Sequence, residues 1–229
     1  MKQLSYYILL IFLFCSNACT SSESISQGEW KYKLYVNGID VGTATISNKT
    51  SDGNFITSQE YSLKFGDMTT VTKDTITETL DFKPVKLENY TKILNSGKVH
   101  ETRMISVFKG RDVELTYDNK KYNYTLKRDF IIDGNYFMTQ LLKNKFKPGL
   151  EATHYVYNPQ VELDTPIKAR TKVIGSEKIM INGKENQFIH IVQSIENIKD
   201  NIDLYIDEKG ILQKGIIHML NLKIELIKI

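Results

Sequence analysis

From Trp30 onward, apolar and polar residues alternate along most of the chain, and turn residues interrupt the alternation about every ten positions. A period of two places successive side chains on opposite faces of a strand, so this pattern predicts antiparallel strands joined by short turns. Asn37-Gly38 and Asn182-Gly183 are typical two-residue hairpin turns, because both residue types tolerate positive φ angles. About twelve segments of this kind predict a mostly β protein, with a curled antiparallel sheet or half-open barrel.

The period changes once, between residues 133 and 147. Phe137 and Leu141 are four positions apart, which favours one apolar face of a helix. Asp133 is a candidate N-cap, because its carboxylate can accept bonds from free amide protons, and Pro148-Gly149 ends the pattern. We therefore predict one short helix over about 133–147, with Phe137 and Leu141 against the sheet.

The start of the chain has the order of a bacterial export signal. Lys2 gives a positive start, and the apolar run Tyr6–Phe14 is too short to cross a bilayer, which needs roughly 20 residues. Cys19 directly follows the small residue Ala18, as in a lipobox, where the signal is cut before a cysteine that carries lipid. We predict a signal peptide over 1–18 and lipid attachment, with palmitate, at Cys19. A plain secretory signal cut near Ala18 is the alternative.

The segment after the predicted cleavage site differs in composition from the rest. Thr20–Gln27 is polar and rich in Ser, and it has too few apolar side chains to fold alone. We predict a lipidated cysteine and flexible tether over 19–28, followed by a single β-rich domain over 29–229. The two cysteines, Cys15 and Cys19, both precede this domain, so it would contain no disulfide.

Charge and motif content disfavour several classes of function. Lys and Arg number 30 against 27 Asp and Glu, and no basic block is present, so we expect no nucleic-acid partner. None of the four histidines has a second His or Cys at metal-ligand spacing. The chain has no Gly-x-Ser-x-Gly nucleophile motif and no Gly-rich phosphate loop. We therefore predict no catalytic residues, no metal site and no cofactor, and we do not expect an enzyme.

Several segments together resemble an uncharacterised family of exported bacterial proteins, known as a domain of unknown function. They are the hairpin Tyr32–Ala44, the aspartate, helix and Pro-Gly of Asp133–Gly149, the paired strands of Lys172–Ile195, and the strand and turn of Leu204–Gly210. The resemblance spans most of the mature chain. It implies a curled antiparallel sheet wrapped partly around a helix, similar to the periplasmic lipoprotein carriers of the LolA and LolB type, and it implies no catalytic residue.

Two hypotheses of different classes follow. The first is a lipid-anchored envelope protein, facing the periplasm or the cell surface, that holds an apolar ligand such as a lipid or acyl chain between sheet and helix, with Phe137 and Leu141 facing the ligand. The second is a structural or assembly factor of the envelope that binds protein partners through sheet edges. A continuous apolar cavity would favour the first hypothesis, and a filled core with a bare edge strand would favour the second. In both, the membrane is contacted through the lipid anchor.

Overall fold

The computed structural model describes residues 25–229, except residues 199 and 220. Within this range the chain forms fourteen strands and one helix, α2 (Asn135–Lys143). The strands before the helix are β1 (Gly28–Val36), β2 (Ile39–Ser51), β3 (Asn54–Phe65), β4 (Met68–Thr79), β5 (Pro84–Asn95), β6 (Lys98–Lys109), β7 (Asp112–Tyr117) and β8 (Lys120–Thr125). The strands after it are β9 (Glu151–Val156), β10 (Ile167–Ile181), β11 (Lys184–Ile195), β12 (Ile202–Ile206), β13 (Leu212–Met219) and β14 (Leu222–Lys228).

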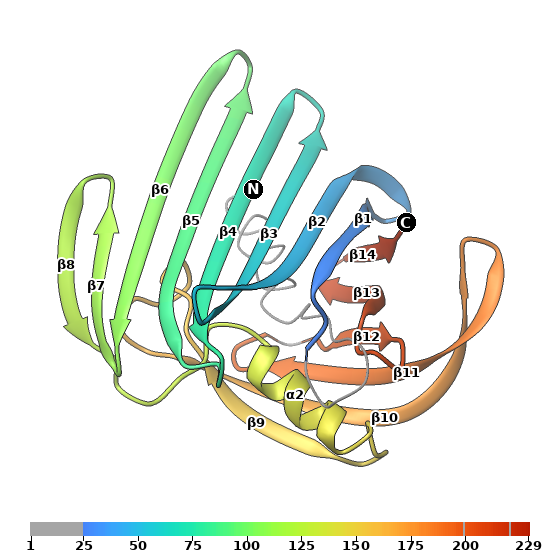
Figure 1. The fold of residues 1–229 in the computed structure, drawn as a ribbon. Coiled ribbons are helices and arrows are strands. Elements are labelled where there is room, and N and C mark those ends of the chain that lie inside the picture. The colour runs from blue at the N-terminus through green and yellow to red at the C-terminus, as the bar shows by residue number, and fades with distance from the viewer. Residues whose placement is uncertain (1–24, 199, 220) are drawn as a thin grey trace.

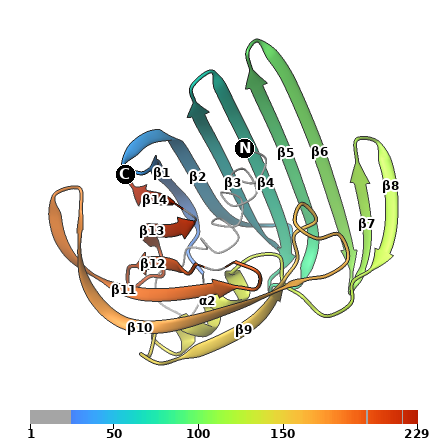
Figure 2. The same ribbon diagram turned by 180° about the vertical axis from the view of Figure 1, so that it is seen from behind.

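All of these strands belong to one antiparallel sheet that curls around the helix (Figures 1 and 2). Strands that follow one another in sequence are neighbours from β1 to β8 and again from β9 to β14, and β1 pairs with β14 between the two runs. We refer to β2–β8 and β9–β14 as the two arms of the sheet. β8 and β9 are its ends, so the sheet does not close into a barrel. The predicted curled antiparallel sheet is thus confirmed.

The strand boundaries differ from the prediction at two places. The pattern predicts one continuous stretch at 211–229, but the chain turns back after Met219, which pairs with Leu222. This turn contains neither Gly nor Pro, and a single Asn, Asn221, is a weaker turn signal than the Asn-Gly pairs of the other hairpins. Conversely, the segments predicted at 167–175 and 178–181 form a single strand, β10, with a register shift between Val173 and Gly175. A bulge bends a strand without ending it.

The hairpin turns follow the sequence signals closely. Asn37 and Gly38 have φ angles of 50° and 80°, and Asn182 and Gly183 have φ angles of 50° and 76°. Two consecutive residues in the left-handed region define the turn type that matches the twist of an antiparallel hairpin.

The helix is shorter than predicted, and its start differs. Gly134, rather than Asp133, is the N-cap residue, and as a glycine it provides no capping side chain. Asp133 lies one position earlier and turns into the interior, where its Oδ1 accepts a hydrogen bond from the backbone N–H of Asn135 at 2.8 Å. At the other end Lys145 and Phe146 take φ angles near 50°. These left-handed residues end the helix before the predicted boundary at 147.

Two apolar clusters fill the interior. The larger one joins β1, β2, β3 and the β9–β14 arm to the helix, which contributes Phe137, Met138 and Leu141. The smaller one lies under β4–β7 and includes Phe108, together with Leu126, Ile132 and Tyr157 from the segments that flank the helix and β9. The rings of Phe108 and Tyr157 meet edge to face, with 5.8 Å between their centroids. The second cluster therefore ties the ends of the open sheet to each other.

The N-terminal end of the described range is packed rather than free. Ile25 and Ser26 are buried. The Gln27 side chain donates a hydrogen bond to Thr50 Oγ1 at 3.0 Å and accepts one from the Thr50 backbone N–H at 3.2 Å. The end of the predicted tether thus contacts β2. In the described part of the chain, no helix has the length and apolar character needed to cross a membrane.

Candidate functional site

The outer edge of β8 is open. β8 pairs only with β7, and no other strand of the described chain lies beyond it (Figure 1). The backbone N–H of Leu126, the residue after β8, donates to Arg111 O at 2.8 Å. Because hydrogen bonding alternates along an antiparallel strand, Tyr122 and Tyr124 also point their backbone groups toward β7.

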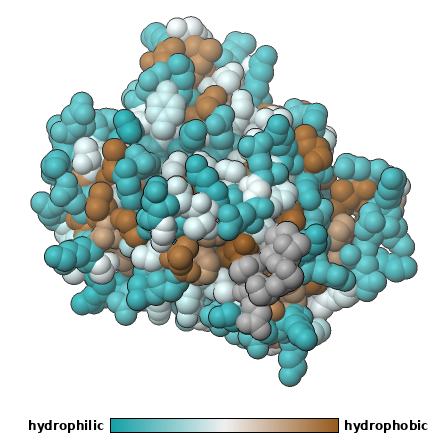
Figure 3. All heavy atoms as spheres, viewed as in Figure 1, coloured by the Kyte–Doolittle hydropathy of each residue, from teal (hydrophilic) through white to brown (hydrophobic). Residues whose placement is uncertain are grey.

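The intervening residues, Lys121, Asn123 and Thr125, therefore direct their N–H and C=O groups outward, and all three are exposed. Hydrophilic side chains line this margin of the molecule, at the left in Figure 3. A short stretch of unpaired backbone of this kind is a template on which another extended segment can pair.

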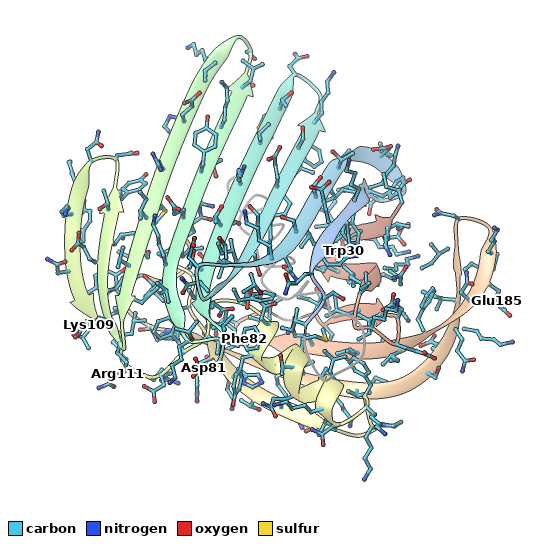
Figure 4. All side chains as sticks on the ribbon, in the orientation of Figure 1. Trp30, Asp81, Phe82, Lys109, Arg111 and Glu185 are labelled. Atoms are coloured by element: carbon cyan, nitrogen blue, oxygen red, sulfur yellow. The ribbon has the colours of Figure 1, made fainter. Side chains whose placement is uncertain are left out.

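A groove of about 460 Å³ lies beside this edge on the outer face of the sheet. Phe108, Val113 and Tyr124 point inward into the second cluster. The alternate residues on the same strands line the groove from the outer face: Val107, Lys109, Asp112, Glu114, Asn123 and Thr125. Figure 4 labels Lys109 and Arg111 at the turn between β6 and β7, next to one end of the groove. Val107 gives the groove an apolar wall, and it is 46% exposed.

A buried carboxyl pair lies where the helix meets β3 and β4. Asp133 and Glu78 are both 1% exposed. Asn135 Nδ2 is their common donor, at 2.5 Å from Asp133 Oδ2 and 3.2 Å from Glu78 Oε2, and it also lies 3.0 Å from Thr57 Oγ1. Burial raises the pKa of Asp133 to about 7. Burial and the neighbouring Asp133 carboxyl raise the pKa of Glu78 well above its usual range. This pair can hold a proton, but it is too enclosed to meet a substrate.

A second buried carboxyl, Asp74, lies further along the inner face of β4. Its Oδ1 accepts a hydrogen bond from Asn89 Nδ2 on β5, and Asn89 Oδ1 accepts one from Gln160 in the loop between β9 and β10. Gln59 on β3 completes the polar lining of a cavity of about 20 Å³. That volume is enough for about one water molecule. Burial raises the pKa of Asp74 to about 7.

The histidines do not form a metal centre. His190 is the most engaged of them: its Nδ1 lies 2.9 Å from Glu177, its Nε2 lies 2.7 Å from Asp203, and its ring stacks on Tyr205. Across residues 25–229, apart from residues 199 and 220, no group of three or more His, Cys, Asp or Glu side chains is arranged to hold a metal ion. The predicted lack of a metal, a cofactor and catalytic residues stays a prediction.

The chain shares its fold with a DUF1849 protein. That beta-barrel-like protein of a domain of unknown function, from Brucella abortus, superposes with a TM-score of 0.63 at 11% identity, over 88% of this chain and 94% of that chain. At this identity the likeness shows the fold alone. The predicted resemblance to bacterial proteins of unknown function is therefore confirmed at the level of the fold.

Two further solved structures are similar at lower scores. A DUF1089 family protein from Pseudomonas aeruginosa gives a TM-score of 0.42 at 9% identity, over 85% of this chain and 92% of that chain. A protein with a YmcC-like fold from Bacteroides fragilis gives 0.34 at 9% identity, over 93% and 98%. These scores are too low to carry an argument. No family model matches the chain, and no curated protein matches its sequence.

The predicted site residues do not come together. Cys19 lies outside the described residues. Phe137 and Leu141 are each 1% exposed and belong to the larger apolar cluster. Neither lines the groove or the polar cavity. Their role as ligand-facing residues stays a prediction, and their position is that of ordinary core side chains.

The sequence analysis did not identify the polar interior. Thr57 and Gln59 on β3, and Asp74 and Glu78 on β4, are buried at positions of the period-two pattern that would suit apolar residues. The available signal was the spacing of these polar residues, which lie two and four positions apart on adjacent predicted strands and therefore share one face of the sheet. Long-range partners such as Asn135 and Gln160 could not be read from the pattern, because nothing local links them to these strands.

Proposed function

We propose that the chain is a bacterial envelope protein that binds an extended segment of another polypeptide along the edge of β8, and that this function is binding rather than catalysis. The observation that carries the proposal is the position of the open edge directly beside the groove. In recognition by strand addition, main-chain hydrogen bonds give affinity and pockets for alternate side chains give specificity. Lys121, Asn123 and Thr125 would supply the main-chain groups.

The groove supports the side-chain part of this recognition. A strand added beside β8 would direct every second side chain to the outer face, where Asn123 and Thr125 line the groove. An apolar side chain of the partner would contact Val107, and polar side chains would meet Lys109 or Glu114.

The experiment compares two substitutions at one edge position. A displayed library of random peptides is selected on the protein, and the selected peptides are then titrated against the Asn123→Pro and Asn123→Ala variants. Both variants lose the Asn side chain, but only proline loses the outward N–H, and an edge strand tolerates proline at such a position. We expect selected peptides with alternating apolar residues that bind Asn123→Ala and not Asn123→Pro. Equal binding to both variants would refute recognition by strand addition.

We further propose that Cys19 anchors the protein to the membrane. The support is the export signal and the lipobox-like order of residues at the predicted cleavage site. Two acyl chains bind a membrane stably, whereas one chain is marginal. Cys19→Ser should move the protein from the membrane fraction to the soluble fraction. If the variant stays with membranes after salt and carbonate washes, the anchoring proposal is wrong.

A further inference from the structure

Two hydrogen-bonded clusters connect the β2–β8 arm to segments outside it, namely the start of the helix and the loop between β9 and β10. In the first, Asn135 at the start of the helix donates to Thr57 on β3 and to Glu78 on β4. In the second, Gln160 in the loop 157–166 donates to Asn89 on β5. Both clusters contain buried carboxyl groups, so side chains that can lose a proton hold the helix start and the loop against the β2–β8 arm.

The first cluster is short of donors unless it carries a proton. Asp133 accepts from the Asn135 backbone N–H, from the Asn135 side-chain amide and from the Thr57 hydroxyl, whereas Glu78 Oε2 accepts from the Asn135 side-chain amide, which it shares with Asp133 and Thr57. Glu78 Oε1 is buried, and no donor in the described chain reaches it. The residues that face the pair are Thr57 from β3 and Asn135 from the helix, and neither carries a positive charge. Two adjacent carboxylates cannot both stay ionised in such surroundings, so a proton belongs to the folded arrangement.

The second cluster has the same shortage of positive charge. The groups that face Asp74 are Tyr61 and Gln59 from β3 and Asn89 from β5, and Gln160 from the loop binds the far side of Asn89. All of these are neutral side chains at neutral pH. An ionised Asp74 would therefore be buried with hydrogen bonds but without a counter-ion, which costs free energy.

We propose that the two clusters form a proton-dependent clasp: they hold the helix start and the loop 157–166 against β3–β5 when their carboxyl groups are protonated, and they release this contact when the protons are lost. Release would separate Gln160 from Asn89 and open the polar cavity beneath Pro159 to solvent. The clasp does not depend on the proposed binding at β8.

The direction of the pH effect follows from the shifted pKa values. The pKa values of Asp74 and Asp133 both rise from 3.8 to about 7, and that of Glu78 rises as well. A group whose pKa is raised by folding stabilises the folded state below its unfolded pKa, near 4, and this contribution is lost as the pH rises through about 7. The clasp is therefore closed in mildly acidic solution and opens above neutrality.

The test measures the distance between the loop and the sheet. Spin labels are placed at Glu162→Cys in the loop and Lys92→Cys on β5, both exposed positions, in the chain with Cys15 and Cys19 replaced by Ser. We expect one narrow distance distribution at about pH 5.5 and a second, longer population at about pH 8.5. Distributions that are identical at the two pH values would overturn the proposal.

Neutral substitutions show whether these carboxyls cause the change. Asp74→Asn with Glu78→Gln imitates the protonated state, so the distribution should stay narrow at both pH values. If the double variant does not fold, Asp74→Asn alone should at least halve the longer population. Asp118→Asn makes the same chemical change at an exposed turn and should leave the pH response intact. A response that persists in the neutral variants, or that disappears in Asp118→Asn, would contradict the clasp.

Discussion

The two edge strands of the sheet, β8 and β9, differ in the contacts that their free sides make. β8 and β9 are both six residues long, and each has a strand neighbour on one side only. At β9 one end of the free side is covered: Ile131 donates its N–H to Tyr155 O and accepts from the N–H of Tyr157, the residue after the strand, both at 2.9 Å. At β8 the outward groups of Lys121, Asn123 and Thr125 have no such cover in the described chain. The fold thus uses an irregular segment to cover one end of the β9 edge, whereas at β8 the loop between β9 and β10 bonds only beyond the strand, where the Lys127 N–H donates to Asp164 O at 3.1 Å.

A simpler explanation is that β8 is protected by its own composition. Short edge strands and exposed lysines are common defences against unwanted strand pairing, and β8 begins with Lys120 and Lys121. The adjoining groove favours a binding edge instead, because a merely blunted edge needs no recess beside it.

The largest loss of stability is expected from a substitution in the apolar core beneath the helix. Leu141→Ala should lower the free energy of unfolding by about 2–5 kcal/mol, because the side chain is fully buried and its removal leaves a cavity. Urea denaturation measures this loss, with the half-exposed Tyr136→Ala as a control on the same helix. Uptake of a fluorescent fatty acid should not depend on Leu141. A small loss of stability together with altered uptake would instead support an apolar ligand beneath the helix.

Opening the covered edge should have the next largest effect. Ile131→Pro removes the N–H that bonds to Tyr155 O and leaves that carbonyl without its donor. The control variant, Ile131→Ala, also loses the isoleucine side chain but keeps the N–H. The free energy of unfolding of Ile131→Pro should be lower than that of this control by about 1–3 kcal/mol. Equal stabilities of the two variants would show that this contact does not protect β9.

The open edge should tolerate proline at alternate positions only. Tyr122 directs its N–H toward β7, so Tyr122→Pro should cost about 1–3 kcal/mol. The N–H of Asn123 points outward, so Asn123→Pro should change the free energy of unfolding by less than about 0.5 kcal/mol. Thermal or urea unfolding of the two variants side by side provides the measurement. A large loss for Asn123→Pro would mean that its N–H already has a partner in the folded protein.

The smallest effect is expected at the ion pair on the outer face of β8. Lys121 Nζ and Glu114 Oε1 are 2.8 Å apart, and both side chains are at least half exposed. Glu114→Gln should therefore destabilise the protein by no more than about 1 kcal/mol, and less at high salt. If unfolding at low and high ionic strength shows a larger and salt-independent loss, Glu114 supports the edge in another way.

The sequence predicts the regular parts of this molecule well, because strands and hairpin turns leave local signals. Alternation located the sheet, and the Asn-Gly turns at residues 37 and 182 have the expected backbone angles. The turn after Met219 was missed because no Gly or Pro marks it. The helix start was misplaced because Asp133 resembles an N-cap, whereas its carboxyl is drawn inward by Asn135 and Glu78, and the pattern does not reveal that pairing.

The sequence predicted that a sheet edge could bind a protein partner, but it did not show which strand forms that edge. Alternation identifies β8 as a strand, but its place at the end of the sheet depends on which strands pair, and that is a property of the whole chain. The cover on β9 was equally hidden, since Ile131 lies in a segment without strand periodicity. The same limitation applies to the clasp, whose members Asp74 and Gln160 are far apart in sequence.

Amide hydrogen exchange in β8, followed by NMR, shows whether this edge is open in the free protein and paired in the complex. The amides of Lys121, Asn123 and Thr125 should exchange rapidly in the free protein, while those of Tyr122 and Tyr124 should be protected by their bonds to β7. A peptide selected as described above should then slow the first three amides and leave the other two unchanged. If the three outward amides are already protected in the free protein, or stay unprotected when the peptide is bound, β8 is not the binding edge.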